Sequence, residues 1–202
     1  ILKYYNPDAS GQENLDSTIQ ALEYAIKMNV DIINYSSGGP EPSLKEKRLF
    51  DLAEKKGILI VSAAGNNGEN IDSYGKEFFP ASYHHQNIIT VGSHDKNFRP
   101  LNSSNFGRRS VDLFAPGKKI LSTLPNDREG YLTGTSQATA FVSAIAANIA
   151  HRYKKTDPAF LKKKILKSVV RMKHLQEYCV TSGILNLKNS PKSASRELAS
   201  NQ

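Results

Sequence analysis

The stretch Gly130-Tyr-Leu-Thr-Gly-Thr-Ser-Gln-Ala-Thr-Ala-Phe-Val-Ser-Ala-Ile-Ala-Ala-Asn-Ile-Ala150 decides the fold that we expect of this chain. Gly134 permits a sharp turn, and Thr135 and Ser136 are natural residues for a helix amino-terminal cap. From Ala138 onward, small and branched apolar residues occupy nearly every side of the projected helix, which predicts a helix buried all round. Ser136 is therefore either a cap or a nucleophile at the positive end of a core helix, where N–H donors favour developing negative charge.

The composition is that of one globular domain. The chain has 202 residues, of which 39% are apolar and 23% charged, which is ordinary for a domain with a full-sized core. The single cysteine, Cys179, excludes an internal disulfide. No apolar run is long enough to cross a bilayer, so we expect no membrane span.

The formal net charge of +8 raises the question of a nucleic-acid partner. Much of the positive charge lies after residue 153, where a solvated helix face and a basic, polar tail over residues 188–202 account for it. The sequence contains nothing that resembles a nucleic-acid-binding motif with interleaved aromatic residues. We therefore expect no specific nucleic-acid partner.

Expected strands and helices alternate along the chain. Strands are expected at residues 1–5, 30–35, 58–64, 87–92 and 111–114, with a hairpin between 120–123 and the region near Tyr131. Helices are expected at 15–29, 43–56, 135–150 and 158–170, and the second should bury Leu44, Leu49, Leu52 and Ala53. This order predicts an α/β fold with three layers, in which a doubly wound, mostly parallel sheet carries helices on both faces. The glycine-rich breaks at 36–39 and 65–68 follow strands, at the edge where such sheets bind ligands.

Three polar segments that contain glycine call for a common chemical explanation: 36–39, 63–66 and 134–136. Acyl transfer needs a nucleophile, donors for an oxyanion and a backbone edge that holds an extended peptide. Ser136 can supply the nucleophile, the Asn66 carboxamide with the Ser136 N–H can supply the donors, and the 36–38 segment can supply the edge. Each feature also has a plain structural reading, as a helix cap or a turn. A phosphate loop is disfavoured because no glycine-rich loop runs into Lys-Ser or Lys-Thr.

Seven landmarks follow one another along the chain. They are Asp31-Ile-Ile-Asn34 running into Ser36-Ser37-Gly38-Gly39; Val61-Ser-Ala-Ala-Gly-Asn66; Pro80-Ala-Ser-Tyr83 before Asn87-Ile-Ile-Thr-Val-Gly92; Asn105-Phe-Gly107; Val111-Asp-Leu-Phe-Ala-Pro-Gly117; Gly134-Thr-Ser-Gln-Ala-Thr-Ala140; and Gly183-Ile-Leu-Asn186. Taken together, these landmarks resemble the carboxyl-terminal two-thirds of a subtilisin-like serine protease (subtilase) catalytic domain, over residues 1–187. All seven occur in the family's order, which is far more specific than any one of them.

The resemblance implies roles for eight residues. It implies that Ser136 is the nucleophile, that Asn66 donates to the oxyanion and that Thr135 supports that site. It further implies that five residues bind the substrate backbone and wall the primary specificity pocket: Ser36, Ser37, Gly38, Ala64 and Gly65. The expected substrate is a peptide or protein, hydrolysed through an acyl-enzyme.

The sequence departs from the family pattern in two places. Where the family continues Gly-Thr-Ser with Met-Ala-Ser-Pro-His, this chain has residues 137–141, Gln-Ala-Thr-Ala-Phe. Phe78 stands near the position where a small residue often forms the floor of the specificity pocket, so the pocket is expected to be shallow.

The catalytic histidine and aspartate that the family uses are missing. No histidine here precedes glycine, and Asp72-Ser73 is followed by Tyr74 rather than glycine. Both partners lie upstream in the family, so we expect this chain to be a fragment that needs the amino-terminal segment of the same domain and is inactive or nearly so alone. The alternative is a non-catalytic relative that binds peptides or partners.

The remaining expectations concern metals and location. His84-His85 is interpreted as a surface loop pair rather than a metal site or relocated base, because no carboxylate or cysteine stands at ligand spacing. No metal ligand is assigned, although the resemblance is compatible with structural calcium. The resemblance also implies a secreted or cell-envelope location.

Overall fold

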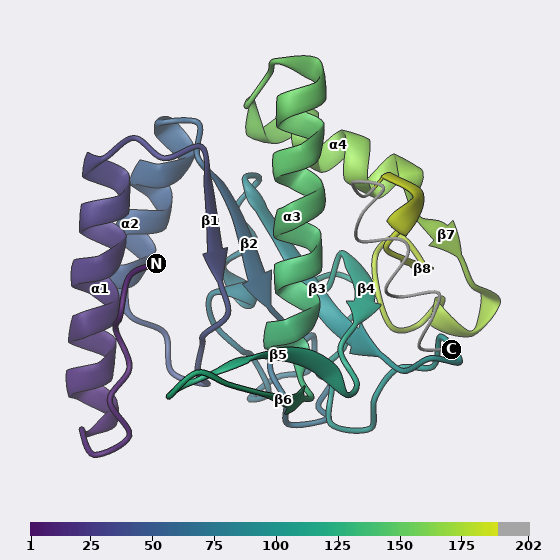
Figure 1. The fold of residues 1–202 in the computed structure, drawn as a ribbon, viewed down its shortest axis with the longest axis horizontal. Helices are drawn as coiled ribbons and strands as arrows, with labels where there is room; N and C mark the ends of the chain where they lie inside the picture. Colours follow the sequence, from purple (N-terminus) through teal and green to yellow (C-terminus); the bar gives the residue numbers. More distant parts are fainter. Residues whose placement is uncertain (190–202) are drawn as a thin grey trace.

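The computed structural model describes residues 1–189 and shows a six-stranded sheet with helices on both faces (Figure 1). The strand order is β1-β2-β3-β4-β8-β7, and every neighbouring pair is parallel except β7 with β8. The strands of this sheet are β1 Ile32–Tyr35, β2 Leu59–Ala63, β3 Ile88–His94, β4 Leu113–Pro116, β7 Val170–Arg171 and β8 Gly183–Ile184. The helices are α1 Gly11–Lys27, α2 Leu44–Lys55, α3 Thr135–Tyr153 and α4 Pro158–Ser168, with short 3₁₀ turns at Ala81–Tyr83, Lys173–Leu175 and Leu187–Asn189. The sheet confirms the expected doubly wound α/β class.

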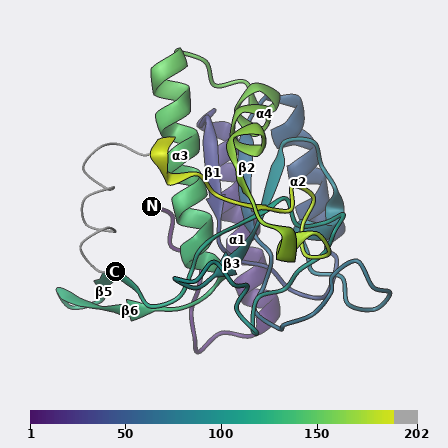
Figure 2. The ribbon, with the colours of Figure 1, turned by 90° about the vertical axis from the view of Figure 1, so that its right-hand side faces the viewer.

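The sheet is the middle of three layers (Figure 2). Successive side chains of a strand point to opposite faces, so Leu59 and Val61 of β2 pack with α3 and α4 while Ile60 packs with α1 and α2. All five residues of β2 are buried, which is why this strand reads as a continuous apolar run in the sequence.

The two helices on the second face begin at side-chain caps. Ser10 and Glu13 form a complete capping box, so α1 begins four residues before Leu15, the first residue of the apolar periodicity. In α2 the buried side chains include Phe50 and Ala53, whereas Leu44 is 77% exposed. The expectation that α2 buries Leu44 and Leu52 was therefore wrong, because the helix turns the face bearing Phe50 toward the sheet.

Helix α3 lies across the sheet and contacts β1, β2, β3 and β4. Its sheet-facing side is buried, but three alanines at helical spacing, Ala140, Ala144 and Ala147, are exposed. The expectation of a helix buried all round was therefore wrong for this stripe. Alanine is apolar enough to mimic a core pattern in sequence, and only the packing shows that nothing in residues 1–189 covers it.

Residues 1–6 form no strand, contrary to the expectation for residues 1–5. Ile1, Leu2 and Tyr5 are exposed. A β-rich sequence becomes a strand only where a neighbouring strand takes its backbone hydrogen bonds, and none of the described residues pairs with it.

The expected hairpin is present as β5 Ile120–Leu124 and β6 Arg128–Leu132, which pair antiparallel. It lies near the amino end of α3, at the edge where the arrows of β1 and β2 end (Figure 1). The register sets Tyr35 beside Ser62 and Ala63 beside Val91, so the segments that follow these strands begin side by side. The polar segments predicted from sequence therefore meet at one edge of the sheet.

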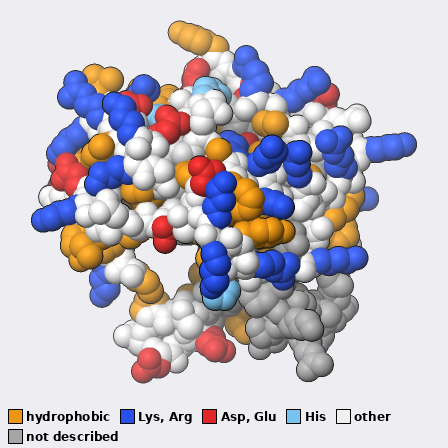
Figure 3. Space-filling model, turned by 90° about the horizontal axis from the view of Figure 1, so that it is seen from above, with side chains coloured by type: hydrophobic (Ala, Val, Ile, Leu, Met, Phe, Trp, Pro, Cys, Tyr) orange, Lys and Arg blue, Asp and Glu red, His pale blue; other side chains and the backbone are white. Residues whose placement is uncertain are grey.

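The face of the molecule in Figure 3 carries lysine and arginine side chains over much of its extent, interspersed with hydrophobic and other side chains and with fewer acidic ones. Several basic groups are engaged within the fold: Lys164 lies over the ring of Tyr153 at 4.5 Å, and Lys162 pairs with Asp112 at 3.4 Å. No helix among the described residues is long and apolar enough to cross a membrane. The expected tail, residues 188–202, lies almost wholly outside the described part of the chain.

Candidate active site

Asn66 and Thr135 meet although 69 positions separate them in the chain. The Asn66 side-chain oxygen accepts the Thr135 N–H at 2.9 Å and the Thr135 hydroxyl at 3.2 Å. The Gly65 N–H donates to the same hydroxyl at 3.3 Å. Thr135 is fully buried and Asn66 is exposed, so the threonine anchors the carboxamide at the first turn of α3. The amide nitrogen of Asn66 lies on the other side of the carboxamide and carries two N–H donors.

Ser136 is the second residue of α3 and is half-buried. Its hydroxyl donates a 3.1 Å hydrogen bond to the Ser36 carbonyl, and the Ser36 hydroxyl donates a 3.2 Å bond to the Ser136 carbonyl. This reciprocal pair joins the start of α3 to the segment after β1. The N–H groups of the first helical turn have no intrahelical acceptors, so the positive end of α3 faces the same place. Ser136, Asn66 and the 36–38 segment thus share one site.

Asn105 holds the loop that carries Asn66. Its side-chain nitrogen donates to the Ala64 carbonyl at 2.9 Å, and its oxygen accepts the N–H groups of Asn67 and Glu69, both at 3.0 Å. Its own N–H donates to the Gly65 carbonyl at 2.9 Å, and only 1% of the residue is exposed. In the sequence, Asn105 is recognisable only as part of the Asn105-Phe-Gly107 landmark, which predicts no role for its side chain. No local signal distinguishes a loop-bracing asparagine from a turn asparagine, because its partners lie about 40 residues away.

The ring of Phe78 lies between the two glycine segments. A β-carbon added at Gly65 would come within 2.9 Å of Phe78 Cε2 and Cζ, and one added at Gly38 within 2.9 Å of Phe78 Cζ. The next residue, Phe79, forms an antiparallel bridge with Gly39 through hydrogen bonds of 2.8 and 3.0 Å. The phenyl ring therefore occupies the space directly over both glycine α-carbons, where any other side chain at those positions would collide with it.

A buried carboxyl supports the same segment from the opposite face of the sheet. Glu46 of α2 is 4% exposed, and its carboxylate accepts the hydroxyl of Tyr35 and lies 3.0 Å from the hydroxyl of Tyr83. Burial raises the pKa of Glu46 and, together with the neighbouring carboxylate, raises the pKa of both tyrosines. Tyr35 immediately precedes Ser36, so this network fixes the point from which the 36–39 segment leaves β1.

None of the five histidines contacts Ser136 within residues 1–189. His85 is only 9% exposed, and its Nε2 lies 2.7 Å from Asp51 Oδ1 beside the Phe50 ring, so the interpretation of it as a surface residue was wrong. The hydrogen bond from His85 lowers the pKa of Asp51. Burial lowers the pKa of His94, whose Nδ1 lies 2.7 Å from the Asp95 carbonyl. No histidine of residues 1–189 is therefore hydrogen-bonded to Ser136 as a base would be.

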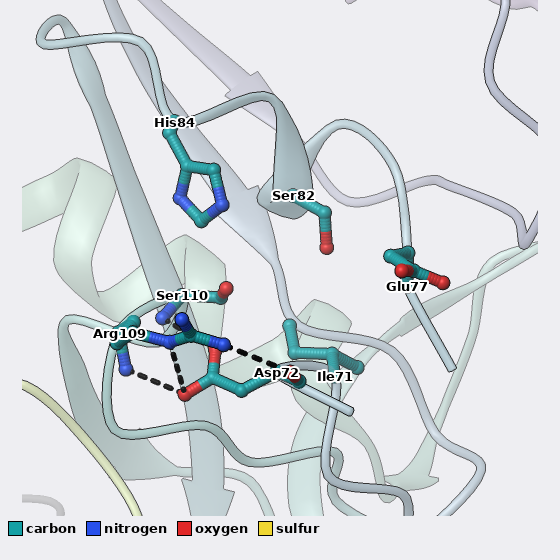
Figure 4. A pocket seen from close by; sticks show the side chains of 7 residues that line it. All are labelled: Ile71, Asp72, Glu77, Ser82, His84, Arg109 and Ser110. Atoms are coloured by element: carbon teal, nitrogen blue, oxygen red, sulfur yellow. Dashed lines mark hydrogen bonds and ion pairs between the residues drawn. The ribbon is translucent and has the colours of Figure 1, made fainter. Parts of the chain in front are cut away.

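A hollow of about 180 Å³ lies apart from the serine and contains none of the predicted site residues (Figure 4). The Asp72 carboxylate in its wall accepts the backbone N–H groups of Arg109 at 2.7 Å and Ser110 at 3.1 Å, and Arg109 Nη2 donates to the Asp72 carbonyl at 2.9 Å. Asp72 thus serves a loop junction. Among the described residues no group of three or more histidine, cysteine, aspartate or glutamate side chains is placed to hold a metal ion. The lining residues are Ile71, Asp72, Glu77, Ser82, His84, Arg109 and Ser110.

The architecture is that of a mostly parallel α/β domain with Ser136 at the start of helix α3. The Asn66 carboxamide is hydrogen-bonded to Thr135, the residue immediately before that serine. The sequence profile of the subtilase family matches residues 2–195, and the chain belongs to that family. It is 39% identical over 140 residues to the major intracellular serine protease of Bacillus subtilis (strain 168), an alignment that covers 69% of this chain and 43% of that protein. It is 32% identical over 182 residues to subtilisin Savinase of Lederbergia lenta, covering 90% of this chain and 61% of that protein.

Solved structures show the same relationship. The prenylagaramide maturation protease PagA superposes with a TM-score of 0.75 at 28% sequence identity, covering 91% of this chain and 69% of that one. The chain therefore has the fold of subtilisin-like proteases. It matches between about a third and three fifths of the length of these curated relatives, from 36% of M-protease to 61% of Savinase. Because the relatives include an intracellular protease as well as subtilisins, family membership does not by itself establish the expected secreted or cell-envelope location.

Proposed function

We propose that this chain is the nucleophile-bearing part of a serine endopeptidase, in which Ser136 forms the acyl-enzyme. The Ser136 oxygen attacks the carbonyl carbon of the scissile peptide bond and its proton passes to a base. The oxyanion is stabilised by the Asn66 amide nitrogen and by N–H groups at the start of α3. The intermediate then expels the protonated amine, and water releases the acyl group. The observation that carries this proposal is the convergence of Ser136, Asn66 and Ser36 at the first turn of α3.

Substrate binding is assigned to the backbone on either side of the serine. Ser36, Ser37 and Gly38 would pair with an extended peptide, and Ala64 and Gly65 would form the opposite wall. These residues offer exposed backbone with little side-chain bulk, as strand addition requires. The substrate class is accordingly a peptide or protein.

The histidine and aspartate are proposed to come from a segment outside this chain. Two features of the fold support a docking place for it. Strand β1 is the edge of the sheet, so one side of its backbone is unpaired among the described residues. The exposed alanine stripe belongs to α3, the helix that packs on β1, and its small side chains would let another helix or strand pack closely against it. Without that segment the serine lacks a base, and we expect the isolated chain to be inactive or nearly so. Structural calcium, with which the family resemblance is compatible, is expected to draw much of its ligand set from upstream residues or from variable loops.

A fluorophosphonate that labels activated serines tests the function. The chain complemented with the amino-terminal segment, fused ahead of Ile1 or added separately, should be labelled at Ser136 and should hydrolyse peptides. Ser136→Ala should abolish both signals. Asn66→Ala should lower kcat by about 100- to 1000-fold with a smaller effect on KM, a scale taken from the oxyanion asparagine of a subtilisin. A folded, complemented domain that stays unlabelled would contradict catalysis.

One observation favours a second candidate, a non-catalytic module that binds peptides. It is the absence of a base beside Ser136 within residues 1–189. In that case the cleft should bind extended peptides with an affinity that Ser136→Ala leaves unchanged, and complementation should add no turnover. Peptide titration of both variants distinguishes the two functions.

A further inference from the structure

We propose that Phe78 closes the primary specificity subsite, so that this protease accepts only glycine, alanine or serine at P1, the residue whose carbonyl is attacked. The inference rests on the proposed peptidase function and adds its substrate class. It depends on where the ring lies relative to the two backbone segments that would hold the substrate.

Both of those segments are tied to the serine helix. The 36–38 segment is joined to Ser136 by the reciprocal hydrogen bonds of 3.1 and 3.2 Å, and Gly65 is joined to Thr135 at 3.3 Å. A peptide that pairs with one segment and presents its carbonyl to Ser136 must direct the P1 side chain between the two. The glycines leave this space free of their own side chains, which would ordinarily make a deep slot.

The phenyl ring of Phe78 fills that slot. Its Cζ approaches within 2.9 Å of the β-carbon position of both Gly38 and Gly65, so it bridges the two walls. Phe78 is nevertheless only half-buried, whereas Phe50 and Phe114 are fully buried. A core phenylalanine would be enclosed on all sides, but this residue keeps part of its surface exposed. Because the ring bridges the two walls, a P1 side chain that enters between them would rest against it.

The ring is also held in place. The Phe78 N–H donates to the Ser82 hydroxyl at 3.1 Å, and the neighbouring Phe79 is paired with Gly39 through two backbone hydrogen bonds. The side chain packs against the buried cluster that contains Ala64. Swinging the ring out would expose its packed face to water, so a bulky P1 side chain cannot displace it without cost. A side chain of one or two heavy atoms needs no displacement.

The test compares peptide substrates that differ only at P1, using the complete protein with its complementing segment. We expect kcat/KM for alanine at P1 to exceed that for phenylalanine at least tenfold, since a single methylene in an apolar pocket already changes selectivity by about 10- to 200-fold. Phe78→Ala should raise kcat/KM for phenylalanine at P1 at least tenfold and leave that for alanine within about threefold.

Phe106→Ala provides the matched control, because Phe106 packs against the same cluster but is not among the residues nearest to the β-carbon position of either glycine. It should leave the P1 ratio unchanged, and the wild-type ratio itself needs no variant to fold. A wild-type enzyme that cleaves after phenylalanine as well as after alanine would overturn the inference while leaving the peptidase function intact. Absence of fluorophosphonate labelling in the folded, complemented protein would overturn both.

Discussion

Replacing Asn105 tests the claim that one buried carboxamide shapes the Asn66 loop. Asn105→Ala removes three side-chain hydrogen bonds, to the Ala64 carbonyl and from the N–H groups of Asn67 and Glu69. Each of these hydrogen bonds contributes a net value of about 1 kcal/mol, and the carbonyl of the fully buried Ala64 loses its Asn105 donor. We therefore expect the free energy of unfolding to fall by about 3 kcal/mol. Urea unfolding followed by circular dichroism measures this loss directly.

Two further variants sharpen the Asn105 test. Asn105→Asp keeps an acceptor for the two N–H groups but turns a second oxygen toward the Ala64 carbonyl and buries a charge. At pH 7 this variant should lose at least as much free energy of unfolding as the alanine variant. The loss should shrink in acid, because the carboxylate takes up a proton there. The exposed Asn97→Ala control should stay within about 0.5 kcal/mol of wild type. A loss below about 1 kcal/mol for Asn105→Ala would refute the reasoning.

Three other predictions follow from single contacts. Gly65→Ala should lower the free energy of unfolding by at least about 2 kcal/mol more than Gly75→Ala. Both glycines have positive φ (98° and 74°), but only an alanine at position 65 would place its β-carbon against neighbouring atoms. Equal losses in the two variants would contradict this. Burial raises the pKa of Glu46, so the folded chain keeps that proton after the unfolded chain has lost it, and stability falls as pH rises from about 4.3 toward the folded pKa. Glu46→Gln should remove this fall in thermal unfolding across pH, and an unchanged slope would exclude the mechanism. Lys162→Met should lower the free energy of unfolding by about 3 kcal/mol at pH 7, because it leaves the buried Asp112 carboxylate without its cation. Burial raises the pKa of Asp112, so this loss should shrink in acid as the carboxylate takes up a proton. A loss independent of pH would contradict the pairing.

Local patterns were sufficient where the physics is local. The continuous apolar run at residues 58–64 predicted β2 because a parallel strand is buried on both faces, and the alternation of strands and helices predicted the layers. The hairpin at 120–132 also followed from its own residues. The capping box of Ser10 and Glu13, which starts α1 at Gly11, is equally local, because both of its side chains lie within four residues of sequence.

Other features depended on partners distant in the chain. The stripe of Ala140, Ala144 and Ala147 looks like core in sequence, but it is exposed because nothing in residues 1–189 packs on it. Residues 1–5 have strand propensity without a strand to pair with. His85 lies in a loop and looks exposed in sequence, but it is buried beside the Phe50 ring and Asp51. In each case the side chain's own chemistry does not determine its environment.

The sequence by itself determined the family, the order of elements and the candidates Ser136 and Asn66, because motif spacing and hydrophobic period are properties of the linear chain. Only the tertiary structure decided that Asn66 is held through Thr135, that Asn105 braces its loop and that Phe78 lies over both glycines. Those facts are distances between positions 13 to 69 residues apart in the chain. Such distances are set by sheet register and by the packing of α3 across the strands, which no local pattern encodes.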